Sequence, residues 1–368
     1  MSKISLSLIL ILFVFSVPVL FASSEEVQTQ PIRFFHESYD TPQLQTLRNE
    51  FDFDEYVSRG KSEFEQMILL KDWVFSHVEF KHNYAVGELR NAIKILRMGR
   101  KGSTFHCSHF AAVYLQSSLS MGWTARYYFL QNIKQEIHAV NEIWSNDYRK
   151  WIFIDVTWNI HVEKNRVPLS LLEMREEWLK NHGMDVVYVF GAGENEIRYT
   201  FRDFPVERSD NNAWIWWPLD EIFITYTYEM ALVGRNNFFS NGAGDGEEVW
   251  DNIYVLRDEL NENDDTWSLR NRTDIDDMRA LYHDINRVDI HPTRVTDRHL
   301  EIRLDAFGEY NFTPNFKEFL VRIDGREWKV SQDNFRWELT RRRNVLEARV
   351  RNRFGVLGPV SELTINSP

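Results

Sequence analysis

Residues 104–130 have the sequence "TFHCSHFAAVYLQSSLSMGWTARYYFL", and this stretch decides the fold. Apolar residues from Phe110 and Val113 onward recur at the spacing of one helix face. Gly122 then supplies a helix stop. The aromatic run after it is typical of a strand. The stretch therefore predicts a helix that begins near Cys107 and is followed directly by a strand.

Cys107 is the only cysteine in 368 residues, so it cannot form a disulfide within the chain. A free cysteine is most often buried packing. Near the start of a helix, however, free N–H groups and the helix dipole favour a thiolate. The backbone N–H of Cys107 is then the first expected donor to an oxyanion, and the second donor stays unassigned. This placement makes Cys107 a candidate nucleophile.

A candidate partner pair lies on the next two predicted strands, 138–144 ("HAVNEIW") and 150–156 ("KWIFIDV"). The pair Asn146-Asp147 suits a two-residue turn, because both residues tolerate positive φ. In that register His138 faces Asp155, with Cβ atoms roughly 4.5–5.5 Å apart. A two-residue slip leaves them diagonal on the same face, and only an odd slip separates them. The alternative is a polar pair on a solvated hairpin face.

These residues together predict a catalytic triad. Cys107 is the expected nucleophile, His138 the general acid and base, and Asp155 the carboxylate that orients the histidine.

The order of these motifs resembles the transglutaminase-like superfamily, whose fold is papain-like, over roughly residues 60–175. The usual pattern is a cysteine-led helix, then "G-hydrophobic-x-A-R", "H-A-W-x-E-hydrophobic" and "W-x-x-x-D-x-T". The matching positions are Gly122, Trp123, Ala125, Arg126, His138, Ala139, Glu142, Trp151, Asp155 and Thr157. The chain departs at Val140, where tryptophan is common, and at Ser103-Thr104, where a closer glycine is usual. The resemblance implies cysteine-dependent acyl chemistry, without choosing between hydrolysis and cross-linking.

Four further residues are weaker candidates for substrate contacts, namely His106, His109, Glu142 and Trp158. Glu142 lies on the same strand face as His138, but a salt bridge to Arg126 is the favoured alternative. The two histidines beside the thiol also leave a zinc site open. Their spacing is unlike the usual structural zinc patterns, so no metal and no cofactor is expected.

The N-terminus has the pattern of a secretory signal peptide at residues 1–22, with an apolar run from about Ile4 to Phe21 and small residues after it. An uncleaved anchor is the alternative, because the run approaches the length of a span. The chain is therefore expected to be exported, to the periplasm or the extracellular space, without a stable membrane span. With 43 Lys and Arg against 55 Asp and Glu, its net charge of −12 argues against nucleic-acid binding.

The fold class is expected to be α+β, with a helix-borne cysteine packed on an antiparallel sheet. The core is placed at residues 23–175 and a mixed, mainly β accessory region at 176–282. Short alternating runs with turn residues between them predict an immunoglobulin-like β-sandwich at 283–368.

The function expected from the sequence is an exported cysteine hydrolase or acyltransferase that acts on a peptide or protein amide, for instance in a cell-envelope polymer. One alternative is an inactive transglutaminase-like module that binds peptide or polysaccharide. A lesser alternative is a carbohydrate-active enzyme, although the sequence pairs no two carboxylates as that chemistry needs.

Overall fold

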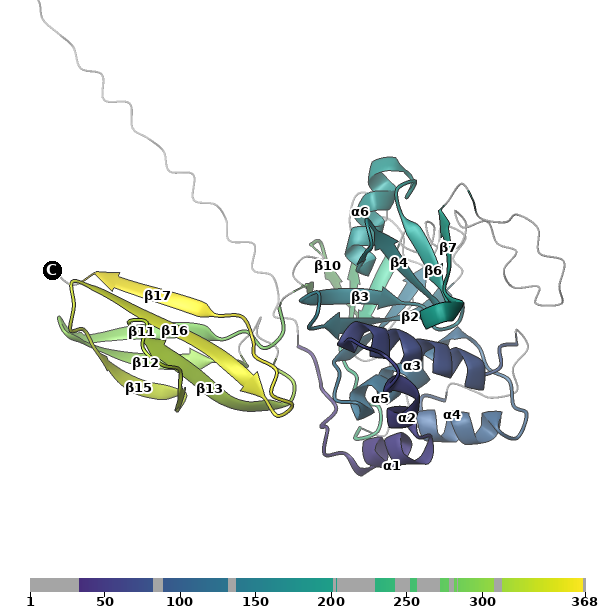
Figure 1. Cartoon of the computed structure of the whole chain (residues 1–368), viewed down its shortest axis with the longest axis horizontal. Helices are drawn as coiled ribbons and strands as arrows, with labels where there is room; N and C mark the ends of the chain where they lie inside the picture. The colour runs from purple at the N-terminus through teal and green to yellow at the C-terminus, as the bar shows by residue number, and fades with distance from the viewer. Residues whose placement is uncertain are drawn as a thin grey trace, which may run out of the picture. The chain divides into compact units, whose positions relative to one another are not determined.

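The computed structural model describes residues 33–81, 89–131, 137–200, 203, 229–241, 252–256, 272–277, 281–282, 284–307 and 313–366. Helices and strands are mixed along the chain, so the α+β class is confirmed (Figure 1). The predicted signal peptide at 1–22 lies outside the described residues. None of the helices in the described part has the length and apolarity needed to span a bilayer.

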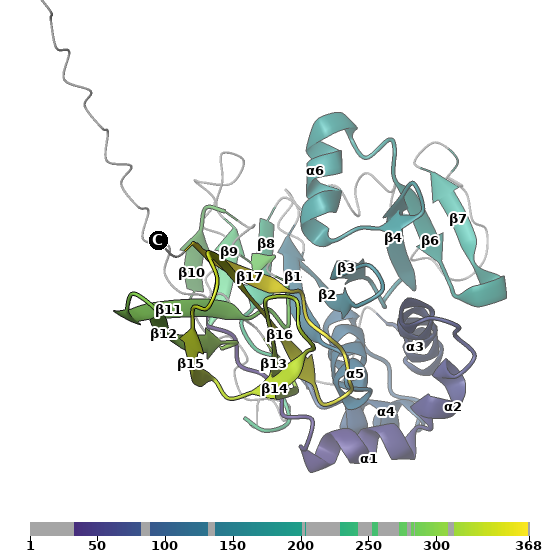
Figure 2. The same ribbon diagram turned by 60° about the vertical axis from the view of Figure 1, so that its left-hand side comes forward.

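The central helix α5 (Cys107–Ser120) begins at Cys107, as the sequence predicts. Its residues from Ser108 onward are buried, because other helices pack around it. It ends before Gly122, whose φ of 84° is a left-handed conformation that costs glycine little. The surrounding helices are α1 (Pro42–Glu50), α2 (Phe53–Val57), α3 (Glu63–His77) and α4 (Ala92–Gly99). Figure 2 shows these helices together on one side of the sheet.

A six-stranded sheet lies against α5 in the order β10-β9-β8-β1-β2-β3. Its strands are β1 (Ala125–Gln131), β2 (Ile137–Ser145), β3 (Lys150–Ile154), β8 (Glu229–Val233), β9 (Ile253–Leu256) and β10 (Arg272–Ile275). All neighbouring pairs are antiparallel except β9 and β10, which are parallel. The helix that carries the cysteine contacts β1 and β2, and β2 carries the candidate histidine.

Side chains of the sheet alternate between two hydrophobic clusters. On β1, Tyr127 and Phe129 join the cluster formed with the helices. Tyr128 and Leu130 face the opposite cluster. Strand side chains point alternately to the two faces, so the sheet is covered on both sides. This burial on both faces holds the hairpin of β2 and β3 in one position relative to α5.

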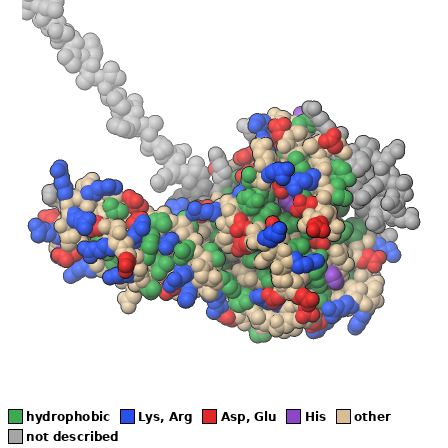
Figure 3. All heavy atoms as spheres, in the orientation of Figure 1, with side chains coloured by type: hydrophobic (Ala, Val, Ile, Leu, Met, Phe, Trp, Pro, Cys, Tyr) green, Lys and Arg blue, Asp and Glu red, His purple; other side chains and the backbone are tan. Residues whose placement is uncertain are grey.

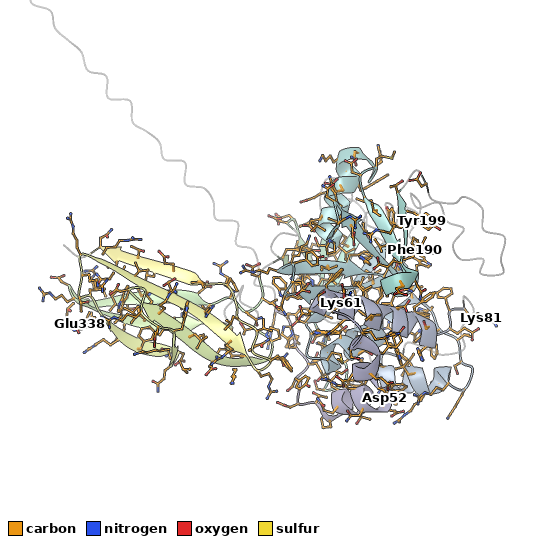
Figure 4. All side chains as sticks on the ribbon, in the orientation of Figure 1. Asp52, Lys61, Lys81, Phe190, Tyr199 and Glu338 are labelled. Carbon is orange, nitrogen blue, oxygen red and sulfur yellow. The ribbon has the colours of Figure 1, made fainter. Side chains whose placement is uncertain are left out.

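The second face is covered by a smaller sheet and one helix. The sheet has the order β5-β4-β6-β7, and the helix is α6 (Leu171–Asn181). The strands are β4 (Ile160–Lys164), β5 (Val167–Pro168), β6 (Val187–Phe190) and β7 (Ile197–Thr200), with a 3₁₀ turn at Gly193–Asn195. Phe190 and Tyr199, labelled in Figure 4, meet edge to face across β6 and β7.

The sequence set residues 176–282 apart as an accessory region, and the structure corrects this. Strands β8, β9 and β10 come from that region, yet they extend the same sheet as β1 and β2. β8 pairs directly with β1, Phe129 opposite Ala231. The pairing joins strands that are about a hundred residues apart, and local sequence patterns carry no record of such a contact.

Residues 288–307 and 313–366 form two further sheets around a third hydrophobic cluster. Their orders are β11-β12-β15 and β14-β13-β16-β17. The strands are β11 (Asp289–Thr296), β12 (His299–Asp305), β13 (Phe316–Ile323), β14 (Lys329–Ser331), β15 (Asn334–Glu338), β16 (Arg343–Asn352) and β17 (Ser361–Asn366). Trp337 from one sheet and Leu346 from the other are both buried in this cluster, so the two sheets share one core.

Acidic and basic side chains are interspersed on the face of the molecule shown in Figure 3. Ion pairs such as Arg97 with Glu50 (2.6 Å) lie at the surface. Exposed pairs of this kind contribute roughly 0–1 kcal/mol each. The hydrophobic clusters therefore carry most of the stability.

Candidate active site

Cys107 is the first residue of α5, so its backbone N–H belongs to the group that has no acceptor inside the helix. The residue is partly exposed, whereas the helix that follows it is buried. Amides at a helix start and the helix dipole both favour negative charge on the sulfur. The only thiol of the chain is thus reachable from solvent and lies where a thiolate is stabilised.

Two histidines cap this end of α5. The Nδ1 atom of His106 accepts from the N–H of Ser108, and the Nδ1 atom of His109 accepts from the N–H of His106, both at 3.4 Å. From the sequence both histidines are weaker candidates for substrate contacts. His109 is instead fully buried and serves as half of the cap. His106 is partly exposed, and its Nδ1 atom lies 4.0 Å from the sulfur of Cys107.

His138 and Asp155 are in contact, with 2.8 Å between Nε2 and Oδ2. The register is not the direct one, because Asn141 pairs with Ile154 and the loop spans residues 146–149. Continuing this ladder makes His138 the diagonal neighbour of Asp155, the arrangement that follows from a slip of two residues. The expected two-residue turn is therefore wrong, but the two side chains share a face.

Asp155 lies one residue beyond β3, in a tight connection to β4. Its backbone forms a bridge with Ile160, with N–H···O distances of 2.9 and 2.7 Å. Its Oδ1 atom accepts from the amides of Thr157 (2.9 Å) and Trp158 (3.3 Å). Its Oδ2 atom is left for His138. The buried carboxylate is therefore held in one orientation by the turn that carries it.

The charges of the pair favour a thiolate beside an imidazolium. Burial by itself would raise the pKa of Cys107, but hydrogen bonds and charge from His106 and His138 outweigh it and lower the pKa to about 6. Burial would lower the pKa of His138, yet the charge of Asp155, its hydrogen bond and the contact with Cys107 raise it to about 10. Because the thiol is then the stronger acid, the proton resides on the histidine near neutral pH.

Trp158 stacks on the ring of His138, with centroids 4.4 Å apart and planes inclined by 23°. The tryptophan is partly exposed, whereas His138 is buried. An aromatic face favours a nearby cation, so this stacking also suits a protonated imidazole. Trp158 therefore lies beside the candidate triad, and its role as a substrate contact stays a prediction.

Glu142 does not face a cleft, which corrects its candidacy as a substrate contact. It is fully buried, and its Oε2 atom accepts two hydrogen bonds from Arg126, at 2.9 and 2.6 Å. Its Oε1 atom accepts from the amide of Leu171 and from the hydroxyl of Tyr282. This is the salt bridge that the sequence favoured, and it joins β1, β2 and α6 below the site.

Replacing Glu142 with Gln is expected to lower the free energy of unfolding by about 3 kcal/mol, because a buried ion pair loses one charged partner. The amide nitrogen would also face a hydrogen-bond donor. Urea denaturation measures the loss, with Glu177→Gln, which weakens a partly exposed pair with Lys164, as the control. The alkylation rate of Cys107 in the folded variant should be unchanged. A slower rate at equal stability would contradict the structural role of Glu142.

One residue near the triad was missed in the sequence. Lys71 of α3 is fully buried and donates to the backbone carbonyls of Asn159 and Gly191. Asn159 closes the connection that begins at Asp155. The available signal was a lysine inside the apolar run "MILLKDWV" at residues 67–74, where helix periodicity places it on a buried side.

The zinc alternative finds no support in the part of the chain that is described. No three side chains of His, Cys, Asp and Glu gather there as a metal site would require. His109, which the alternative needed as a ligand, is turned into the helix cap.

Part of the chain is similar to a known protein family. Residues 52–156 match the family model of the transglutaminase-like superfamily, and this range includes Cys107, His138 and Asp155. No curated protein matches the chain.

Two solved structures are similar to parts of the chain. One is a TGase, with 14% identity and a TM-score of 0.26 over 38% of this chain and 35% of that one. The other is a candidate cysteine protease from Cytophaga hutchinsonii, with 16% identity and a TM-score of 0.27 over 50% of this chain and 56% of that one. The chain thus spans about a third and about a half of these two proteins. Residues 52–156 are thus the part of the chain that is similar to the transglutaminase-like superfamily.

Proposed function

We propose that the protein is a cysteine enzyme that transfers or hydrolyses the acyl group of an amide. The observation that carries the proposal is the chain of contacts from Cys107 through His138 to Asp155. It combines a thiol of lowered pKa, a histidine in contact with it and a buried carboxylate on that histidine. These are the parts that nucleophilic catalysis by cysteine needs.

In the proposed reaction the Cys107 thiolate attacks the amide carbonyl carbon, and the carbonyl oxygen takes the negative charge. The backbone N–H of Cys107 stabilises that oxyanion. His138 gives its proton to the leaving amine, and a thioester on Cys107 remains. His138 then takes a proton from water or from a second amine, which attacks the thioester; the Cys107 thiolate leaves and the thiolate–imidazolium pair is restored. Asp155 holds the ring of His138 through its Nε2 atom, and the ring is also in contact with Cys107.

The proposed substrate is a peptide or protein amide, including amides of a cell-envelope polymer. The apolar run near the N-terminus followed by small residues supports an exported location. For residues 288–366, the split into three and four strands supports an immunoglobulin-like sandwich, because that fold divides its strands between two sheets in a similar way.

The pH dependence of alkylation by iodoacetamide tests the proposal. A thiol with a lowered pKa gains its reactive thiolate as the pH rises through the lowered value. The rate for Cys107 should therefore reach half its maximum near pH 6, where its pKa lies, and stay level above that. An ordinary cysteine reaches half its maximum near pH 8.5.

A folded protein whose labelling stays slow until about pH 8.5 would contradict the proposed enzyme. That result would favour a module whose core binds peptide or polysaccharide without catalysis. Because the chain has one cysteine, every label reports on this site.

A further inference from the structure

Lys71 is a buried cation that the proposed reaction does not use. It lies on α3 with its side chain fully buried. Its Nζ atom donates to the carbonyl oxygen of Asn159 at 2.9 Å and to that of Gly191 at 3.0 Å. Burying an amino group costs free energy unless it is hydrogen-bonded, and these two carbonyls supply the bonds. Because burying an amino group costs free energy, we expect Lys71 to fix the position of the backbone to which it donates.

Asn159 is the residue that this contact holds. It has a φ of 57°, in the left-handed region. Its carbonyl oxygen accepts from the N–H of Gly191 as well as from Lys71. Its side chain donates to Oδ1 of Asp72 at 2.7 Å, and Oδ2 of Asp72 accepts from the hydroxyl of Tyr56 at 2.9 Å. Two consecutive residues of α3, Lys71 and Asp72, thus hold Asn159 by hydrogen bonds to its backbone and to its side chain.

Asn159 belongs to the connection that begins at Asp155. The N–H of Asn159 donates to the carbonyl of Val156, and the next residue, Ile160, is bridged to Asp155. The second acceptor of Lys71 is the carbonyl of Gly191, the residue directly after β6, which ends at Phe190 (labelled in Figure 4). Lys71 therefore ties α3 to the turn that supports the candidate catalytic carboxylate and to the strand beside it.

We propose that Lys71, with Asp72 and Asn159, is a positioning residue that fixes the Asp155 turn and thereby the orientation of His138 toward Cys107. This inference rests on the proposed cysteine chemistry and adds a residue to it. Lys71 does not touch the reacting atoms. It acts through Asp155, whose Oδ2 atom must stay within hydrogen-bond reach of His138.

The two hydrogen bonds donated by Lys71 do not depend on its charge. Burial lowers the pKa of Lys71 to about 7, with the charges of Asp72, Glu196 and Asp155 opposing that shift. A neutral amine keeps two N–H groups, and the structure shows two carbonyl acceptors. The turn is therefore held on both sides of neutral pH, as an enzyme working there requires.

Lys71→Met in the full chain removes the amine and keeps most of the apolar stem. We expect the half-maximum of Cys107 alkylation to move up by roughly one pH unit, which makes labelling at pH 5 roughly tenfold slower. Leu70→Ala is the matched control, since Leu70 is the neighbouring residue of α3 and equally buried. It should lower the melting temperature through a cavity and leave the alkylation profile in place.

A double-variant cycle separates positioning from general loosening. If Lys71 acts through Asp155, Lys71→Met should have no further effect on labelling in an Asp155→Asn background. Asp72→Ala, at a partly exposed position, provides a milder test should Lys71→Met fail to fold. It removes the side-chain grip on Asn159 and should shift the profile in the same direction by a smaller amount.

Each outcome bears on one proposal. Labelling of a folded Lys71→Met or Asp72→Ala variant with the profile of the unmodified protein would overturn the positioning role alone. The positioning role would also be overturned if Leu70→Ala shifted the alkylation profile as much as Lys71→Met does. It would be overturned as well if Lys71→Met slowed labelling in the Asp155→Asn background as much as it does in the unmodified protein. Slow labelling of the unmodified protein would overturn the proposed enzyme and this inference with it.

Discussion

Replacing Cys107 with Ala is expected to abolish acyl transfer, with a loss of roughly four orders of magnitude or more in turnover. The substitution removes the only sulfur nucleophile of the chain and leaves the helix start in place. A suitable probe is p-nitrophenyl acetate, because it acylates an activated thiol and releases a coloured product. Mass spectrometry should detect one acetyl group on Cys107 in the unmodified protein and none in the variant.

Two controls make this result specific. Cys107→Ser keeps nearly the same shape but has a hydroxyl that does not ionise near neutral pH, so it should be inactive as well. Ser103→Ala, at a partly exposed position just before α5, should keep its activity. Unfolding temperatures of the three variants should stay close to that of the unmodified protein. Retained acylation in a folded Cys107→Ala variant would exclude this thiol as the nucleophile.

The second large effect is expected for His138→Ala. Without the histidine, the pKa of Cys107 should return from about 6 toward its ordinary value near 8.5. At pH 7 the thiolate fraction would fall from roughly nine tenths toward roughly three hundredths, so alkylation should slow by up to about thirtyfold. The difference should shrink as the pH rises, because an unassisted thiol also ionises. Rates measured between pH 5 and 10 follow both changes.

His77→Ala is the matched control for that experiment. This imidazole stacks on Trp73 at the end of α3 and is exposed. Its removal should leave the alkylation rate unchanged. An alkylation rate in His138→Ala equal to that of the unmodified protein would show that the thiol owes its acidity to the helix start or to His106 instead.

Local patterns predicted the parts of the site that depend on neighbouring residues. The helix starts at Cys107 and ends before Gly122, and His138 meets Asp155. Predicting that contact did not need the exact strand register, because a slip by any even number of residues keeps the two side chains on one face of the sheet. The predicted register was wrong because the conformation of the β2–β3 loop depends on hydrogen bonds to residues far away in the sequence. The N–H of Asn146 donates to Glu63, and Asp147 accepts from the amide of Phe64.

The roles of the flanking polar residues depended on burial, which the sequence leaves open. His109 is part of the helix cap because its ring lies inside, against Phe105. Glu142 became part of an ion pair because Arg126 lies directly opposite it on β1. Lys71 was missed because its partners are backbone carbonyls about ninety residues or more away. A backbone acceptor leaves no mark in a sequence pattern.

The two oxygens of Asp155 have separate duties, and this has a consequence for anyone who wishes to transplant the site. Oδ1 is committed to the amides of Thr157 and Trp158, and Oδ2 to His138. The aspartate thus also stabilises the turn that carries it. Glutamate, one methylene longer, could not place its two carboxylate oxygens at both positions at once. A graft onto another hairpin would have to carry the whole segment from residue 155 to residue 160, together with its anchor on α3. Copying three side chains would deliver a carboxylate with nothing to aim it.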